Sequence, residues 1–219
     1  FLNFEIICGV NSPRYSLDIN GMSRGPFDLI AFDLGNVLTI VDESQAAKVI
    51  AQKTGASEAA VKERVFGPYF KAPLETGRQT WEEFAEAAIR SLGPTISANE
   101  LRDLYCSVLT PNTSLFPLVD NLAQRYRLAL CSNTSPVHWE LERKRISFAR
   151  LLDPVVLSYK IGVMKPDRAI FETISNASKT PPHRILFIDD MAENVAGARE
   201  AGITALRFEN VAKLQHDLI

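Results

Sequence analysis

Apolar and polar positions follow two different patterns along the chain. Short, mainly apolar runs occur at residues 27–34, 127–131, 154–157, 184–188 and 203–208. Runs of this kind, without an alternating polar face, are typical of strands buried on both sides of a parallel sheet. From residue 111 onward, stretches with apolar residues every three or four positions separate these runs and predict helices. The alternation predicts an α/β fold with a doubly wound, Rossmann-like parallel sheet.

Residues 43–110 show only the helical pattern and contain no convincing strand. Ser57, Thr80 and Ser97 each precede an amphipathic stretch, where N-cap residues are expected. Proline and glycine interrupt the pattern between residues 67 and 79, which predicts a loop with at most a short helix. An all-helical insert after the first strand is typical of a cap that encloses a small substrate.

The same patterns divide the chain into three parts. We expect residues 27–42 and 111–219 to form the α/β core, and residues 43–110 to form the helical cap. Residues 1–26 fit neither pattern and are expected to be an N-terminal extension. Its first 21 residues are expected to be mobile or loosely packed.

Composition limits the possible partners. The chain has 219 residues, 46% of them hydrophobic and 23% charged, with a formal net charge of −2. Nothing in this balance indicates nucleic acid or an anionic membrane as a partner, and no apolar run is long enough to span a bilayer. We therefore expect a cytoplasmic protein, monomeric or homodimeric, whose partner is a small molecule.

Cysteine and histidine residues give little indication of chemistry. The cysteines are far apart and odd in number, which favours free thiols in a reducing compartment: Cys8, Cys106 and Cys131. No spacing of cysteine and histidine suggests a zinc site. The histidines are expected to lie on the surface without a catalytic role: His138, His183 and His216.

Polar residues that could carry chemistry follow the ends of the predicted strands. In a parallel sheet the carboxyl ends of the strands meet at one edge, so these residues are expected to converge. They are Asp33, the run Ser132-Asn133-Thr134, Lys165, and the pair Asp189-Asp190.

This set of residues has a chemical logic. The carboxylates of Asp33, Asp189 and Asp190 would repel one another unless a cation lies between them, and an all-oxygen ligand set suits Mg²⁺. Lys165 would bind a phosphate and help to keep Asp33 ionised, while the Ser132 hydroxyl would contact phosphoryl oxygens. Asp33 could then attack phosphorus and form an aspartyl-phosphate intermediate.

Four motifs resemble those of the haloacid dehalogenase superfamily of hydrolases. They are AFDLGNVL, LCSNTS, the S-x-x-x-G-x-x-KPD run over 158–167, and FIDDMAENVAGAREAGI. The similarity covers residues 28–209, and the helical insert resembles the type 1 cap of that superfamily. The branch it most resembles contains sugar-phosphate phosphatases and the N-terminal phosphatase domain of soluble epoxide hydrolases.

The resemblance implies a role for each matching residue. Asp33 would be the nucleophile and a Mg²⁺ ligand, and Lys165 would balance charge. Asp190 would bind the metal directly, and Asp189 directly or through water. The other implied roles are metal coordination by the Gly35 carbonyl, phosphate binding by Ser132 and Asn133, and support of the metal site by Asn194.

Gly35 is a departure from the pattern of phosphatases in this superfamily. They usually carry an aspartate at this position, which protonates the leaving group. A general acid contributes a rate factor of about 10²–10⁴, so a good leaving group would suffer least from its loss. Asp42 or Glu43, in the segment that joins the core to the cap (the hinge), could protonate the leaving group instead, and so could a residue of the cap.

These observations favour a Mg²⁺-dependent phosphomonoester hydrolase that acts on a small, sugar-like phosphate. Arg78, Gln79 and Trp81 are candidate substrate contacts in the cap, although Trp81 fits the cap core better. One alternative is a 2-haloacid dehalogenase, in which Asp33 attacks carbon without a metal; the acid pair at residues 189–190 argues against it. A second alternative is a phosphate-binding protein of the same fold with impaired catalysis.

Overall fold

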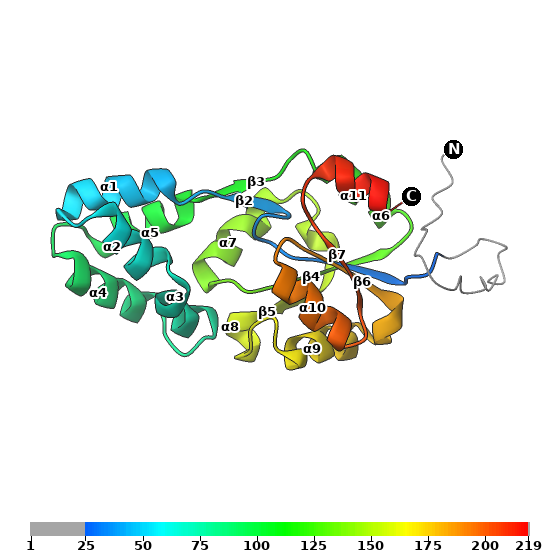
Figure 1. Ribbon diagram of the computed structural model, residues 1–219. Coiled ribbons are helices and arrows are strands. Elements are labelled where there is room, and N and C mark those ends of the chain that lie inside the picture. The colour runs from blue at the N-terminus through cyan, green and yellow to red at the C-terminus, as the bar shows by residue number, and fades with distance from the viewer. Residues whose placement is uncertain (1–24, 219) are drawn as a thin grey trace.

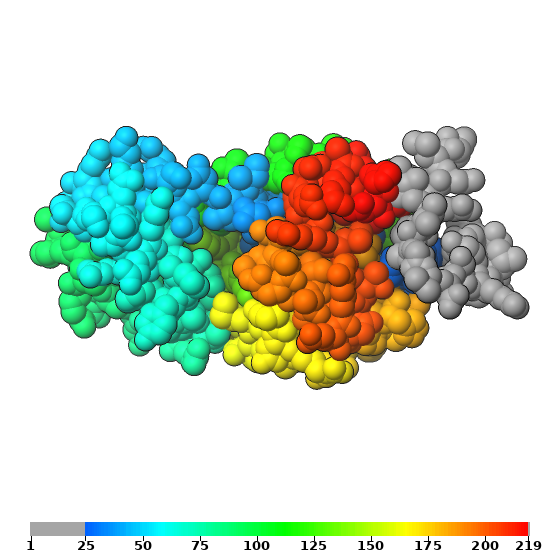
Figure 2. Space-filling model, in the orientation of Figure 1, coloured from blue at the N-terminus to red at the C-terminus, as the bar shows by residue number. Residues whose placement is uncertain are grey.

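The structure, a computed structural model, describes residues 25–218. The expected N-terminal extension therefore lies, up to residue 24, outside the described residues. Two lobes make up the described chain (Figure 1), and Figure 2 shows them side by side. One lobe contains the sheet, and the other is built of helices.

A five-stranded parallel sheet forms the centre of the larger lobe. Its strand order is β5-β4-β1-β6-β7, with β1 in the middle. In register, Ala31 of β1 lies between Ala129 of β4 and Phe187 of β6. The strands are β1 (Leu29–Phe32), β4 (Arg127–Ser132), β5 (Leu152–Leu157), β6 (Ile185–Asp189) and β7 (Thr204–Arg207). The predicted α/β core with a parallel sheet is confirmed.

Apolar side chains on alternate residues of β1 pack into two different clusters. Ile30 and Phe32 contribute to one cluster, and Leu29 and Ala31 to the other, because successive residues of a strand point to opposite faces. Helices cover both faces. The first cluster includes residues of α6 (Phe116–Ala123), α7 (Pro136–Arg145) and α11 (Val211–Asp217), and the second residues of α9 (Arg168–Ser178) and α10 (Ala192–Glu200). The remaining short elements are η2 (Ala149–Leu151), α8 (Ser158–Ile161) and η3 (Pro182–Arg184).

The helical lobe is inserted between two short strands. β2 (Thr39–Val41) and β3 (Leu109–Pro111) form an antiparallel pair that connects it to the core. Its helices, which we call the cap, bury an apolar cluster of their own. They are α1 (Ser44–Thr54), α2 (Glu58–Val61), η1 (Lys62–Phe66), α3 (Pro68–Glu75), α4 (Trp81–Leu92) and α5 (Ala98–Ser107).

Sequence patterns missed one feature of this lobe and allowed for another. The strand β3 begins inside the range expected to be wholly helical, because its partner β2 is distant in sequence and only the fold brings the two together. The segment expected to be a loop with at most a short helix contains the eight-residue helix α3, which starts with Pro68 at a position where proline is tolerated. Leu74 of α3 is fully buried, and this packing outweighs the unfavourable Pro73 inside the helix.

None of the helices between residues 25 and 218 combines the length and apolar character needed to cross a membrane.

Candidate active site

Asp33 lies directly after β1, at the carboxyl edge of the sheet, and its side chain is buried. Its backbone N–H donates to the Ile188 carbonyl at 2.9 Å, which extends the β1–β6 pairing by one residue. Its Oδ1 atom accepts a hydrogen bond of 2.7 Å from the Leu34 N–H. The pairing with β6 therefore fixes the backbone of Asp33, and the Leu34 N–H orients its carboxylate.

Lys165 lies between two carboxylates. Its Nζ atom is 2.8 Å from Oδ1 of Asp33 and 2.6 Å from Oδ2 of Asp189, and its side chain is fully buried. Burial alone lowers the pKa of this ammonium, but the adjacent Asp33 and Asp189 raise it above its ordinary value. Lys165 is therefore a permanent positive charge within the cluster.

Burial has the opposite effect on the acid. Desolvation raises the pKa of Asp33 to about 6; the charge of Lys165 lowers it, and that of Asp189 raises it further. A cation bound beside Asp33 would favour its ionised form.

Asp33, Asp189 and Asp190 can each offer an oxygen to one metal ion, with these atoms within 4.8 Å of one another. Asp189 is already surrounded by donors: Lys165 and Asn194 bind Oδ2, and Asn194 and the Met191 N–H bind Oδ1. Asp190 is only partly buried, and burial raises its pKa. The donor set suits Mg²⁺, with Asp190 more available to it than Asp189.

The loop after β4 brings a hydroxyl and an amide to the same edge. Ser132 is fully buried at the end of the strand. The Asn133 side chain donates to the Lys165 carbonyl at 2.9 Å and accepts from the Lys165 N–H at 2.8 Å. The Thr134 N–H donates to the Ser158 hydroxyl at 3.0 Å. Asn133 thus holds the loop that carries Lys165 against the loop that follows β4. The sequence motif alone does not reveal this role.

The two acids of the hinge differ in environment. Asp42 is exposed, and its hydrogen bond from the Ser44 N–H at 2.9 Å is the main cause that lowers its pKa. Glu43 is half-buried, and burial raises its pKa, although Lys71 and Lys62 lower it. Of the two acids, Glu43 is thus the one whose pKa is shifted toward that of a general acid.

Three cap residues considered as substrate contacts divide into two groups. Trp81 is buried in the cap core, where it packs beside Phe84 and Tyr105. Arg78 and Gln79 line a groove of about 450 Å³ on the cap. The residues described around this groove all belong to the cap.

The expected surface position of the histidines is wrong for His138, which is buried. Its ring stacks on Tyr105 at 4.2 Å between centroids, and its Nε2 atom lies 2.9 Å from the Tyr105 carbonyl oxygen. The prediction failed because the sequence does not show that α7 packs against α5 of the cap, where Tyr105 covers the His138 ring. The other two histidines, His183 and His216, are exposed.

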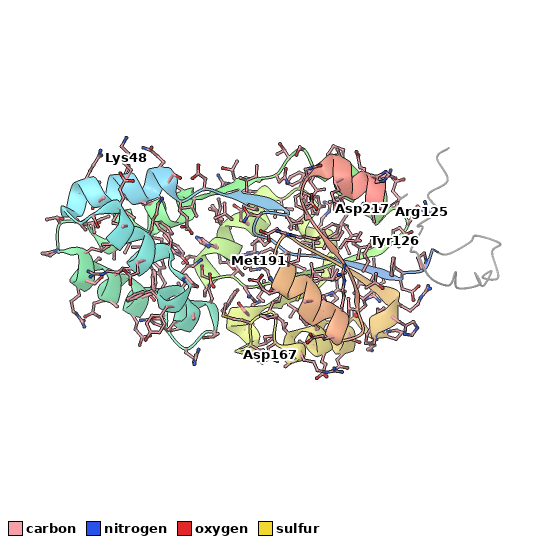
Figure 3. The ribbon with its side chains drawn as sticks, viewed as in Figure 1. Lys48, Arg125, Tyr126, Asp167, Met191 and Asp217 are labelled. Atoms are coloured by element: carbon pink, nitrogen blue, oxygen red, sulfur yellow. The ribbon has the colours of Figure 1, made fainter. Side chains whose placement is uncertain are left out.

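Asn36 was not among the predicted site residues, but its side chain donates to Asp190 at 3.2 Å. The only signal in the sequence was its position after Gly35, a pair of residues that favours a sharp turn. The acid it binds is followed by Met191, which lies at the start of α10 on the side of the core that faces the cap (Figure 3).

Several known proteins resemble this chain in sequence or in fold. A curated relative, the D-ribitol-5-phosphate phosphatase of Bacteroides thetaiotaomicron, is 25% identical over 197 residues, which are 86% of this chain and 95% of the relative. A solved structure of a HAD family enzyme from Bacteroides thetaiotaomicron, in complex with magnesium and inorganic phosphate, has a TM-score of 0.75 at 24% identity and covers 86% of this chain and 98% of its own. A predicted HAD-like hydrolase from Porphyromonas gingivalis has a TM-score of 0.75 at 27% identity, over 88% and 98% of the two chains.

The family model for haloacid dehalogenase-like hydrolases matches residues 27–202. This range contains the candidate catalytic cluster and the cap together. The protein is therefore an enzyme of the haloacid dehalogenase-like hydrolase family.

Proposed function

We propose that the protein is a Mg²⁺-dependent phosphomonoester hydrolase that works through an aspartyl-phosphate intermediate. The observation that carries the proposal is the buried contact of Lys165 with Asp33 and Asp189, next to the partly open Asp190. The three acids can hold a divalent cation, and Lys165 together with the Ser132 loop can bind a phosphate dianion.

Asp33, the Gly35 carbonyl and Asp190 would hold the Mg²⁺, and Asp189 would bind it directly or through water. When bound, the ion neutralises phosphoryl charge and lets an anionic nucleophile approach. Among the described residues, the hydrogen bonds to the Asp33 carboxylate from Leu34 and Lys165 both reach Oδ1. Its second oxygen is thus the one available to attack phosphorus.

Attack by Asp33 forms a bond to phosphorus and breaks the bond to the leaving-group oxygen. Lys165, Ser132 and backbone N–H groups of the following loop would hold the phosphoryl oxygens during this transfer. Water then attacks the phosphorus of the aspartyl phosphate, and the bond between phosphorus and the Asp33 oxygen breaks. Inorganic phosphate leaves with the protons of this water, and the Asp33 carboxylate is restored. Asn133 and Asn194 act indirectly here, since they hold Lys165 and Asp189.

The leaving-group oxygen needs a proton, and Gly35 cannot supply it. Glu43 is our candidate for this role in preference to Asp42, because its half-buried carboxyl has a raised pKa, whereas that of Asp42 is lowered. Glu43 is also the N-cap residue of α1, so it lies where the hinge enters the cap.

The substrate is proposed to be a small sugar or polyol phosphate. The family relative that acts on D-ribitol 5-phosphate, similar over nearly its whole length, supports this class. The cluster of three acids argues against the 2-haloacid dehalogenase alternative, which has no need of a metal site. A protein that only binds phosphate would not need the nucleophilic carboxylate of Asp33 in contact with Lys165.

The proposal includes the division of labour between the lobes. Residues 27–42 and 111–219 would carry the chemistry, and residues 43–110 would select the substrate. The free thiols of Cys106 and Cys131 are compatible with the proposed cytoplasmic location.

Phosphate release from a panel of sugar, polyol and glycerol phosphates tests the proposal, with Mg²⁺ or with EDTA. We expect turnover that EDTA abolishes and that Asp33→Asn reduces by at least about 10³-fold, since the nucleophile is lost. Asp120→Asn, at an exposed position on α6, is the matched control and should keep full activity. Metal-independent turnover, or an active Asp33→Asn variant, would refute the mechanism.

A further inference from the structure

Asn36 has a backbone conformation that side chains rarely adopt. Its φ of +53° lies in the left-handed region, where glycine is the usual residue and asparagine is tolerated. It follows Gly35 directly, in the turn that leads from β1 to β2. Besides Asn36, only Lys179 among the non-glycine residues of the described chain has a positive φ, and it lies at the end of α9.

Both ends of the Asn36 side chain are engaged. Oδ1 accepts a hydrogen bond of 3.2 Å from the Val41 N–H, and Nδ2 donates one of 3.2 Å to Oδ2 of Asp190. A backbone N–H can only donate and an ionised carboxylate can only accept. The partners therefore fix the orientation of the amide, and the side chain bridges the acid and the strand.

The two neighbouring acids depend on different partners. Asp189 receives donors on both oxygens from Lys165, Asn194 and the Met191 backbone. Asp190, in contrast, has Asn36 as its side-chain donor within the described chain. The hydrogen bond to Oδ2 holds this carboxylate beside the other two acids of the cluster.

Val41 lies at the end of β2, immediately before the chain enters the cap. The next residue, Asp42, donates its N–H to the Val108 carbonyl on the returning segment at 2.9 Å. A side chain bound to Val41 is thus attached to the base of the cap, while its other end is attached to the metal-site acid.

We propose that Asn36 is a positioning residue that orients Asp190 for Mg²⁺ and links the metal site to β2, the strand that carries the cap. The inference rests on the Mg²⁺-dependent function proposed above. It assigns Asn36 a role through Asp190, without contact with the reacting atoms. Hydrogen-bond partners that orient metal ligands typically change metal affinity by about 10- to 100-fold when they are removed.

Asn36→Gly is the informative variant, because glycine accepts the left-handed backbone and removes only the side chain. Lys179→Gly is the matched control: it makes the same backbone change at φ +54°, at an exposed site on the far end of α9. Isothermal titration of the full-length protein with Mg²⁺ alone measures the metal affinity without any turnover. We expect the dissociation constant of Asn36→Gly to rise about 10-fold or more, and that of Lys179→Gly to equal the parent value.

Hydrogen exchange at the Val41 amide reports the link to the cap. In the parent, saturating Mg²⁺ should slow this exchange, and in Asn36→Gly it should not. An Asn36→Gly dissociation constant within twofold of the parent value would overturn the proposal and leave the phosphatase function standing. Absence of Mg²⁺ binding by the parent would overturn both.

Discussion

The hydroxyl of Thr39 donates a hydrogen bond of 2.6 Å to the Glu142 carboxylate, and both side chains are fully buried. Thr39 belongs to β2 and Glu142 to α7, the helix that lies between the cap and the sheet (Figure 1). Arg145, also on α7, binds Glu142 at 3.0 Å and the Leu109 carbonyl of β3 at 3.0 Å. One helix of the core therefore holds both strands that lead to the cap.

Thr39→Val removes the hydroxyl and keeps the shape of the side chain. It leaves a buried carboxylate oxygen without its donor, so we expect the free energy of unfolding to fall by about 1–3 kcal/mol. Urea unfolding followed by circular dichroism measures this loss. Thr113→Val, at an exposed turn position, is the control and should change stability by less than about 0.5 kcal/mol. Equal effects at the two sites would contradict the buried interaction.

Lys165→Met leaves Asp33 and Asp189 buried without their shared counter-charge. Breaking a buried pair from one side costs about 3–5 kcal/mol, so we expect a large fall in melting temperature and loss of turnover. Mg²⁺ should restore part of the stability, since it supplies positive charge to the same acids. The control is Lys213→Met, whose ion pair with Asp217 at 2.8 Å is partly exposed and should contribute less than about 1 kcal/mol. A Lys165→Met protein as stable as this control would contradict the geometry.

Buried His138 should make the protein sensitive to acid. Burial is the main cause that lowers its pKa from 6.5 to about 4, while its contact with the Tyr105 carbonyl raises it. Between these two pH values the imidazole of His138 is protonated in the unfolded chain and neutral in the folded chain. The contribution of neutral His138 to the free energy of unfolding amounts to about 3 kcal/mol. It is fully present above pH 6.5 and is lost as the pH falls from 6.5 to about 4.

His138→Gln does not titrate and keeps an amide donor for the Tyr105 carbonyl. The free energy of unfolding, measured from pH 7.5 down to pH 4.5, should therefore decline less steeply in this variant than in the parent. Parallel curves for the two proteins would rule out a buried neutral imidazole.

Gly77 forms a close contact between the cap and the core. A Cβ atom added there would lie 2.2 Å from the Tyr159 carbonyl oxygen of α8, and φ is +68°. Gly55 has a similar φ of +73°, but a Cβ atom there would meet nothing within 4 Å. Gly77→Ala should therefore destabilise the protein by about 1–3 kcal/mol more than Gly55→Ala, and raise KM by displacing the cap. Thermal unfolding and steady-state kinetics of the two variants measure these effects. Equal melting temperatures and equal KM values would contradict the predicted role of the contact.

Gly35 has room for a Cβ atom, the first atom of the acid that the family pattern usually places there. A Cβ atom would have Val41 Cγ2 as its nearest neighbour, at an ordinary 3.6 Å, and φ is not positive. Gly35→Asp should increase kcat for substrates with poor leaving groups, by a factor of up to about 10². Aryl phosphates, which need little protonation, should gain much less. Gly35→Ala is the control without an acid, and an equal response of both variants would exclude proton donation as the cause.

Local patterns predicted the elements that depend on local information. The apolar runs before Asp33, Ser132 and Asp189 are strands, because burial on both faces leaves a continuous apolar signal. The convergence of these residues followed from parallel topology alone. The distances of Lys165 to two acids could not follow from sequence, because they depend on how the loop after α8 folds back.

The features that were missed all depend on contacts between distant segments. β2 and β3 form only because the two linkers meet, and His138 is buried only because α5 lies over it. Asn36 looked like a turn residue, and its partner Asp190 lies 154 positions further along the chain. Such pairs leave no periodic signal, so only the folded structure reveals them.

The β2–β3 pair gives the cap an entry and an exit on neighbouring backbones. Adjacent strands lie about 4.8 Å apart, so the cap forms a closed excursion whose ends nearly touch, and it has an apolar cluster of its own. We therefore expect that insertions, deletions or replacement of the helices within it leave the register of the parallel sheet unchanged. If the cap selects the substrate, as proposed above, specificity can change without any change in the sheet that carries Asp33.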